Sequence, residues 1–256
     1  MKNYYLLSIL LLTITISGYS QNKLTKEERR TLRKIGLIIK LTNPDAVPPR
    51  NIAESTLGGR TYNGLSEDEH FKRSDKSLQI LNKIVDDIDP YNFKSSEIIF
   101  SSIESFSSNQ DPIKIVKLDN EFQLLLADPP HKKDKTDRVI HNTTDEIKLK
   151  MKNERIETQK KYDTIYQYLK NNGFDGLLTI SIKHWSTFAV KFQLGNGPRW
   201  TSQANTGYYA RIFSIDDKLL FHKKYFSKTV PALKYKKTFN DFIKDHTEKV
   251  FKEIMK

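Results

Sequence analysis

The chain has 256 residues, of which 37% are hydrophobic, so it is long enough to bury a substantial core in one large or two small domains. It contains no cysteine, which excludes disulfides, thiol nucleophiles, thiolate zinc sites and iron–sulfur clusters. Its net charge of +12 comes mainly from lysines spread along the chain, whereas arginine, the usual reader of phosphates and bases, is scarce, so a solvated basic surface is favoured over a nucleic-acid site.

The first twenty residues predict a cleaved secretory signal peptide. Lys2 supplies the positive end, Leu6–Ile16 is a short apolar run, and small residues at Gly18 and Ser20 occupy the positions that a signal peptidase reads. Cleavage is expected between Ser20 and Gln21. The alternative, an uncleaved membrane anchor, is disfavoured because a spanning helix needs roughly 20 apolar residues. We therefore expect an exported protein, periplasmic or secreted and soluble, that is not anchored through a lipidated cysteine. Export without disulfides favours a bacterial source.

The stretch that follows predicts a short helix and then a buried strand. Thr25 and Glu28 have the spacing of a capping box, which starts a helix reaching about Lys34. The dense apolar run Ile35–Leu41 predicts a central strand, because both of its faces are apolar. The residues 45–73 are rich in Gly and Pro and predict a long loop.

Two helices and a hairpin are expected next. Ser74 is expected to cap a helix that ends at Asp89-Pro90, and residues 95–106 predict a second helix. Residues 113–118 and 121–127 predict two strands, joined by a turn at Asp119-Asn120.

A polar segment, Asp128–Arg138, predicts the best domain boundary in the chain. It separates an N-terminal α/β part, 21–138, from a C-terminal helix–strands–helix part, 139–256, although the two could form one continuous domain. A second capping box at Thr143–Glu146 predicts a helix that reaches Asn172 and ends at Gly173. Its almost wholly polar middle must either break or project into water.

The last part of the chain predicts strands and a final helix. Residues 176–182 form a strand, and 188–194 form either a second strand or an extension of the first, before a turn at Gly195–Pro198. Residues 207–215 and 219–226 predict a hairpin, and a helix is expected from about Thr238. The fold class predicted is α+β, with a mixed or antiparallel sheet and helices packed on one face.

Residues 162–256 resemble a known group of proteins in their pattern. An amphipathic helix ending in Asn-Asn-Gly-Phe-Asp-Gly is followed by the strand Leu-Leu-Thr-Ile-Ser-Ile, a hairpin and a helix. This order is similar to exported bacterial envelope proteins whose α/β domain is similar to the N-terminal domain of the Tol-Pal periplasmic translocation protein. The resemblance implies a binding or assembly role without catalysis.

The histidines give no metal motif and no cofactor is expected. None of the six pairs at the spacing that places two ligands on one helix face. His184 and His222 lie in or beside predicted strands and could meet across the sheet, but half-buried or surface histidines are favoured over a metal site.

An enzymatic alternative rests on the acidic residues Glu67–Glu69 next to His70. An acidic cluster beside a histidine can form a general acid/base pair or a calcium site, and this one falls in the predicted loop. It supports the alternative of an exported hydrolase that uses the Glu67–His70 loop. A solvated stretch is the favoured interpretation, and no residue is assigned a catalytic role, because the sequence has no nucleophile elbow and no phosphate-binding loop.

Aromatic and basic residues alternate in the strand region. The rings could stack on a ligand, although the same alternation is typical of a strand with rings in the core and charges in water. If a functional surface exists, we expect it here, with the candidate residues Trp185, Trp200, Tyr208, Arg199 and Arg211. The sequence thus favours a non-catalytic binding or assembly component of the bacterial cell envelope, with another envelope protein as partner. A polyanion-binding protein, driven by the net charge, is the remaining alternative.

Overall fold

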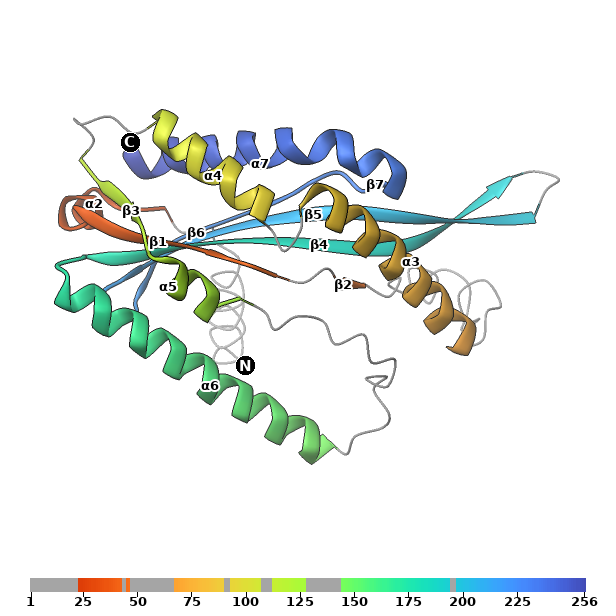
Figure 1. Ribbon diagram of the computed structural model, residues 1–256, viewed down its shortest axis with the longest axis horizontal. Helices are drawn as coiled ribbons and strands as arrows, with labels where there is room; N and C mark the ends of the chain where they lie inside the picture. Colours follow the sequence, from red (N-terminus) through yellow and green to blue (C-terminus); the bar gives the residue numbers. More distant parts are fainter. Residues whose placement is uncertain are drawn as a thin grey trace, which may run out of the picture.

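The computed structural model describes residues 23–42, 45–46, 67–89, 93–106, 112–127, 144–193 and 197–256. Within these residues the fold is α+β, with six helices and a mixed sheet (Figure 1). The predicted signal peptide, with Ser20 and Gln21, and the predicted boundary at Asp128–Arg138 lie outside them. None of the helices in the described ranges combines the length and the apolar character that a membrane span requires.

The helices and strands alternate irregularly along the chain. The helices are α2 (Lys26–Thr31), α3 (Glu67–Ile88), α4 (Phe93–Phe106), α5 (Asn120–Leu125), α6 (Thr144–Asn171) and α7 (Ala232–Met255). The strands are β1 (Lys34–Lys40), β2 (Asp45–Ala46), β3 (Lys114–Lys117), β4 (Gly176–Gln193), β5 (Gly197–Ser214), β6 (Leu219–Phe226) and β7 (Val230–Pro231). The predicted C-terminal order of helix, three strands and helix is confirmed.

The five main strands lie in the order β3-β1-β4-β5-β6. β1 runs parallel to both β3 and β4, as predicted for a strand in the middle of a sheet. β4, β5 and β6 are successive antiparallel neighbours, so the sheet is mixed. The short strands β2 and β7 add to β4 and β5. Strands from before and after residue 128 therefore belong to one sheet.

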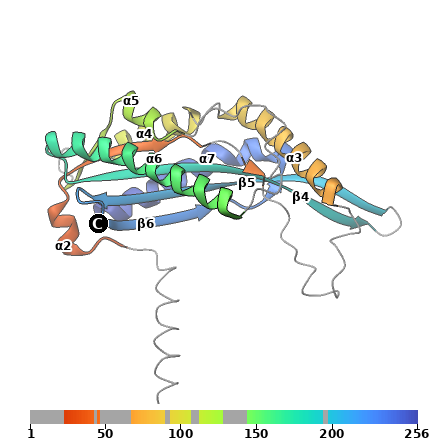
Figure 2. The ribbon, with the colours of Figure 1, turned by 90° about the horizontal axis from the view of Figure 1, so that it is seen from below.

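Helices cover both faces of this sheet, so the prediction that they pack on one face is wrong. α3, α4 and α7 lie on one side, which we call the α7 face, and α5 and α6 lie on the other, the α6 face (Figures 1 and 2). The reason is visible in β1, where Leu37 and Ile39 join the core beneath α7 while Ile38 joins the core beneath α6. A strand that is apolar on both sides requires cover on both sides.

The α6–β4 connection ties the second half of the chain to β1. Asp175 Oδ2 accepts hydrogen bonds from the backbone N–H groups of Arg33 and Lys34, both at 2.8 Å. The Lys34 ammonium lies 4.0 Å from the centre of the Phe174 ring. These contacts fix the register in which Ile35 faces Gly176.

Several local predictions are confirmed. The Glu28 N–H donates to Thr25 Oγ1 at 3.2 Å and the Thr25 N–H donates to Glu28 Oε2 at 2.9 Å, which completes the capping box of α2. α6 ends at Asn171, and Gly173, which follows it two residues later, has a φ of 65°, a conformation that favours glycine. Residues 152–160 of α6 are exposed, so its polar stretch projects into water without a break.

The N-terminal part of the predicted 45–73 loop is only partly described, and its end is a helix. α3 starts at Glu67, so Ser74 is an internal helical residue and does not cap the helix. Acidic residues favour the first turn of a helix because they interact well with its positive end, and a single serine costs a helix little. Residues 45–46 pair with β4.

The predicted strand 121–127 is a helix, α5, so the predicted hairpin does not form. Phe122 and Leu126 are both buried, and their separation of four residues places them on one side of a helix. The buried Gln123 docks α5 on the strand: Oε1 accepts from the Ile39 N–H at 2.7 Å and Nε2 donates to the Leu37 carbonyl at 2.9 Å. One side chain thus replaces the neighbouring strand where β3 has ended.

The long hairpin also extends further than predicted. β4 is a single strand through Gln193, so the segment 188–194 is an extension of the first strand, and β5 begins at Gly197, ten residues before the predicted start. α7 begins at Ala232 rather than near Thr238. Pro231 precedes it, and proline is compatible with the beginning of a helix because the first N–H groups have no helical partner.

Candidate functional site

Two adjacent residues of β4, His184 and Trp185, lie on opposite faces of the sheet and differ in burial. His184 is fully buried on the α7 face, and its ring centre lies 5.5 Å from that of Phe239 in α7. Trp185 points to the α6 face, because successive side chains of a strand alternate. It is only partly buried. At this position in β4 the α7 face is a closed core, whereas the α6 face is open to the exterior.

The α7 face holds a buried polar network around His184. Its Nε2 lies 3.2 Å from Asp89 Oδ2 and its Nδ1 lies 2.6 Å from the Tyr235 hydroxyl, which also bonds Thr206. Asp89 in turn accepts hydrogen bonds from the Ser95 backbone N–H at 2.8 Å and from the Ser95 hydroxyl. Burial raises the pKa of Tyr235, so its hydroxyl keeps its proton. The network joins α3, α4, α7 and the sheet.

This network is a structural device, because all five of its side chains are buried and their polar groups bond one another. His184 and His222, which the sequence left open as a pair that could meet across the sheet, do not meet. His222 pairs with Arg211 on the α6 face, whereas His184 lies on the α7 face, so the two rings have the sheet between them. Among the described residues no cluster of histidines and carboxylates could hold a metal ion.

An aromatic cluster lies on the α6 face, beyond the helices that cover its other part. The rings of Trp185, Tyr209 and Phe226 surround Gly207, with centres 5.8 to 6.2 Å apart. A Cβ atom at Gly207 would lie 2.5 Å from the Trp185 ring and 2.9 Å from the Tyr209 ring, so the glycine makes room for them. Phe226 exposes 53% of its surface. Phe226 therefore reaches the exterior, and the partly buried rings of Trp185 and Tyr209 pack beside it.

Basic groups surround the aromatic cluster. Lys183 and Arg211 are exposed, and Lys224 and His222 lie beside Tyr209 and Arg211 on β6. Neither Lys183 nor Arg211 pairs with a carboxylate of the described chain. β4, β5 and β6 contain no acidic residue at all. We call this surface the aromatic–basic face; its members are Trp185, Tyr209, Phe226, Lys183, Arg211, His222 and Lys224.

The pKa values of the ring residues reflect this positive environment. Partial burial, together with the charges of Arg211 and Lys224, lowers the pKa of His222 below its ordinary value of 6.5. Its Nε2 is buried and has no hydrogen-bond partner in the described part of the chain. Burial raises the pKa of Tyr209, while Arg211 opposes that shift. At neutral pH the face therefore combines fixed cations with a neutral imidazole.

The face ends at α6 and at the β5–β6 turn. Burial raises the pKa of Tyr162, a residue of α6 whose hydroxyl is within electrostatic range of Arg211. Tyr166 donates a hydrogen bond to Asp217 Oδ1 at 2.8 Å, and Lys170 pairs with Asp216 at 3.7 Å. The two carboxylates of the turn, Asp216 and Asp217, therefore interact with α6 and do not pair with Lys183 or Arg211 of the strands.

The candidate residues predicted from the sequence do not form one surface. Trp185 and Arg211 belong to the aromatic–basic face, but Tyr208 is fully buried on the α7 face, because it is opposite Ile182 and next to Tyr209 in an alternating strand. Trp200 and Arg199 pair with Val190 and Lys191 near the far end of the hairpin, and their side chains lie outside the description. The same is true of the side chains of Glu67–His70, whose backbone is the first turn of α3.

The sequence prediction did not include Phe226 and Gly207, and it did not group them with Tyr209 in one cluster. Only the register of β4, β5 and β6 brings them together, and a signal for that register was present in the alternation of each strand. No protein-family model matches the chain, and no match to it was found among curated proteins.

Proposed function

We propose that this chain is an exported, non-catalytic binding protein of the bacterial cell envelope, and that it docks an acidic protein partner on the aromatic–basic face. The single observation that carries the proposal is the partly exposed cluster of Trp185, Tyr209 and Phe226 beside the cations of the same face. The predicted signal peptide and the resemblance of residues 162–256 to envelope proteins support the cellular context.

The residue types of this face suit a protein partner. Trp, Tyr and Arg are the residues that most often dominate binding energy at protein–protein interfaces, because they bury a large area and still offer a polar group. Here Trp185 and Tyr209 are partly buried and held edge to face, at 76°, so little conformational entropy is lost when a partner covers them. The scaffold is already in its binding conformation.

The positive charge of the face favours a partner with a negatively charged surface. Lys183 and Arg211 have no ion pair in the described chain, so a carboxylate of a partner can approach them without displacing an internal one. Opposite charges across an interface speed association and discriminate against other partners, and their effect falls with ionic strength. An acidic surface with apolar side chains is the complement of this face.

Photo-crosslinking in the producing bacterium tests the proposal. Benzoylphenylalanine replaces Phe226 in one strain and the exposed Lys244 of α7 in a matched control strain. We expect a discrete crosslinked product from position 226 alone, and mass spectrometry should identify an exported protein of acidic isoelectric point. Products of equal yield from both positions, or none from either, would contradict the proposal.

The polyanion alternative gives a different result in a parallel experiment. If the face serves to bind an anionic polysaccharide, the purified protein elutes from a heparin column at high salt, and Arg211→Glu lowers the elution salt concentration much more than Lys244→Glu does. We expect the two charge reversals, which change the net charge equally, to lower it equally. A selective effect of Arg211→Glu on heparin would replace the protein partner with a polyanion.

A further inference from the structure

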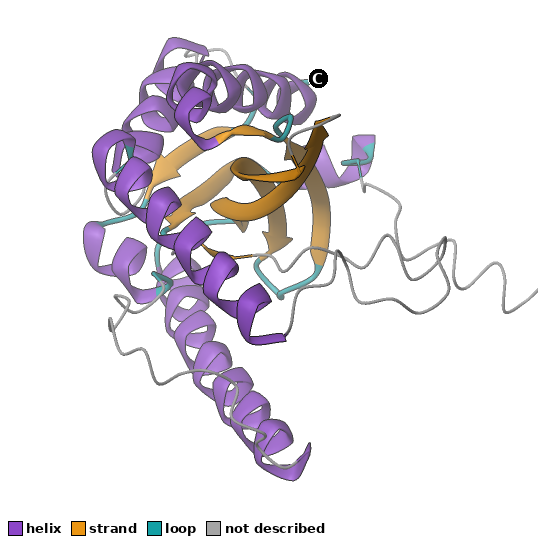
Figure 3. Cartoon of the chain, turned by 90° about the vertical axis from the view of Figure 1, so that its right-hand side faces the viewer, coloured by secondary structure: helices purple, strands orange, loops and turns teal. Residues whose placement is uncertain are grey.

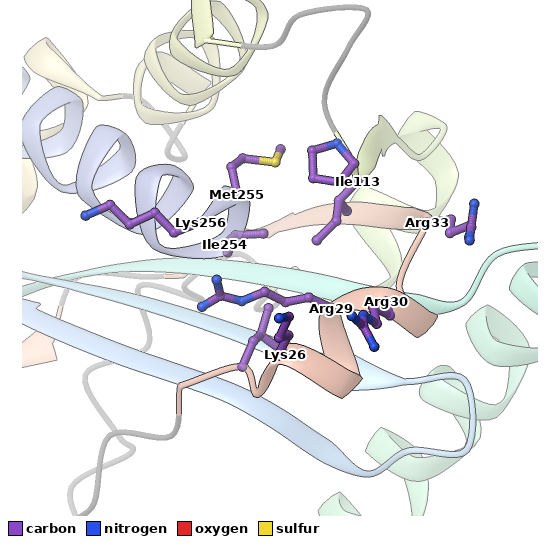
Figure 4. A pocket seen from close by; sticks show the side chains of 10 residues that line it. Lys26, Arg29, Arg30, Arg33, Ile113, Ile254, Met255 and Lys256 are labelled. Atoms are coloured by element: carbon purple, nitrogen blue, oxygen red, sulfur yellow. The ribbon is translucent and has the colours of Figure 1, made fainter.

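A cavity of about 660 Å³ lies at one end of the sheet, next to α2 and the C-terminal end of α7. It is formed between α2, the C-terminal turn of α7 and the residues that lead into β3 (Figure 4). This volume lies within the range of small-molecule sites, roughly 300–1,000 Å³. The cavity is separate from the aromatic–basic face, because its apolar residues Leu24, Ile113 and Ile254 belong to the core of the α7 face.

The lining of the cavity has one sign of charge. Its charged residues are all cationic, and they surround an apolar part. Their side chains form no ion pair with a carboxylate in the described ranges. The cations are Lys26, Arg29, Arg30, Arg33 and Lys256, and the apolar residues are Leu24, Pro112, Ile113, Ile254 and Met255.

Arg29 brings a buried hydrogen-bond donor to the lining of this cavity. Its Nε is buried and has no hydrogen-bond partner among the described residues, although Arg29 extends from α2 beneath Ile254 in Figure 4. A buried donor without a partner is costly, and burying part of a guanidinium is more so. The capping box of Thr25 and Glu28 fixes the helix that carries it. An anion in the cavity would accept this hydrogen bond.

We propose that this cavity binds an organic anion that has a phosphate or carboxylate head group and a short apolar chain. The head group is held by Arg29, with Lys26 and Lys256 adding positive charge, and the chain contacts Pro112 and Met255, the apolar lining residues that are not buried. Arginine suits such a head group because its planar fork matches two oxygens of a phosphate or carboxylate. The site is independent of the partner proposed for the aromatic–basic face.

Isothermal titration with octyl phosphate, below its micelle concentration, tests the proposal on the full mature chain. Inorganic phosphate removes the apolar chain and octyl glucoside removes the charge, so we expect octyl phosphate to bind more tightly than either. Arg29→Ala should weaken its binding about tenfold or more, as the loss of a charge-assisted hydrogen bond implies. Lys152→Ala, an exposed cation of α6, is the control and should leave binding unchanged.

If Arg29→Ala fails to fold, Lys26→Glu provides the same test. Lys26 is exposed, so its substitution removes no core contact. We expect it to weaken octyl phosphate binding at least as much as it weakens inorganic phosphate binding. Equal affinities for octyl phosphate and octyl glucoside, or full binding in both variants, would overturn the proposal. Binding only to vesicles of phosphatidylglycerol, with none to monomeric octyl phosphate, would also overturn it in favour of a membrane surface.

Discussion

The two faces of the sheet treat polar and aromatic residues in opposite ways. On the α7 face, the polar groups of His184, Asp89 and Tyr235 are buried and bonded to one another. On the α6 face, beyond the helices, the rings of Trp185 and Phe226 reach the exterior next to cations that have no carboxylate partner in the described strands. Both faces belong to the same curved sheet, which Figure 3 shows.

This difference separates the residues that hold the fold from those that can serve a partner. A buried and satisfied network contributes specificity to the core, and removing a member leaves the others unpaired. An exposed aromatic cluster contributes less to folding and leaves apolar area available for an interface. Residues of the buried network and residues of the aromatic cluster should therefore respond differently to substitution.

The largest expected effect comes from Asp89→Ala. It leaves the His184 Nε2–H and the Ser95 N–H buried without their acceptor, so we expect the free energy of unfolding to fall by about 3–5 kcal/mol. Urea denaturation followed by circular dichroism measures this. Asp87→Ala, an exposed change in the same segment, should cost less than about 0.5 kcal/mol. Equal costs for the two would show that the network does not stabilise the α7 face.

A single buried amide plays a comparable role beneath the α6 face. Gln123→Ala removes the acceptor of the Ile39 N–H and one of two donors to the Leu37 carbonyl, which keeps the Leu118 N–H, so the free energy of unfolding should fall by about 1–3 kcal/mol. Hydrogen exchange should show faster exchange of the Ile39 amide in particular. Glu121→Ala, an exposed neighbour in α5, should leave that amide protected. An unchanged rate at Ile39 in Gln123→Ala would rule out the docking role of this side chain.

A smaller effect on stability, with a clear effect on the surface, is expected from Gly207→Ala. The new methyl group would collide with the outer part of the Trp185 ring, which can move outward, so the cost in stability should be about 1 kcal/mol. In a Trp200→Phe background the emission of Trp185 reports the movement, and we expect a red shift. An emission spectrum identical to that of the parent would mean that Gly207 does not position the cluster.

The smallest expected effect concerns His222. Because the folded protein lowers its pKa, the folded state binds fewer protons than the unfolded state as the pH falls. Its contribution to stability is complete above the unfolded pKa of about 6.5 and is lost as the pH falls toward the folded value. An NMR titration of the imidazole should give a pKa below 6.5, and Arg211→Gln should raise it. A pKa unaffected by Arg211→Gln would place the cation away from the ring.

The sequence predicted the ends of helices well where interactions within the same element determine them. Thr25 and Glu28 determine the start of α2 through their own hydrogen bonds, and Gly173 determines the end of α6 through its own φ. The apolar pattern of Phe122–Leu126 is too short to distinguish the period of a helix from that of a strand. Only the contact of Gln123 with β1 decides in favour of a helix. That contact lies 84 residues away in the sequence and has no local signal.

The candidate site was predicted in part for the same reason. Of the predicted candidates, Arg211 is exposed and Trp185 is partly buried on the same face of the sheet. Tyr208 and Tyr209 are neighbours with equal aromatic character, and the composition of the strand does not say which one faces the core. The pairing of Gly207 with Phe226 and of Ile182 with Tyr208 decides it, and register is a property of three strands together.

The central claim is that the aromatic–basic face, and not the net charge of the protein, recognises an acidic partner. Two double variants with equal net charge test it most directly: Lys183→Glu with Arg211→Glu on this face, and Lys244→Glu with Lys249→Glu on the exposed side of α7. Their affinities for the partner identified by crosslinking are measured at two salt concentrations. We predict that the first pair abolishes binding while the second retains it. Equal losses of affinity from both pairs would contradict the claim.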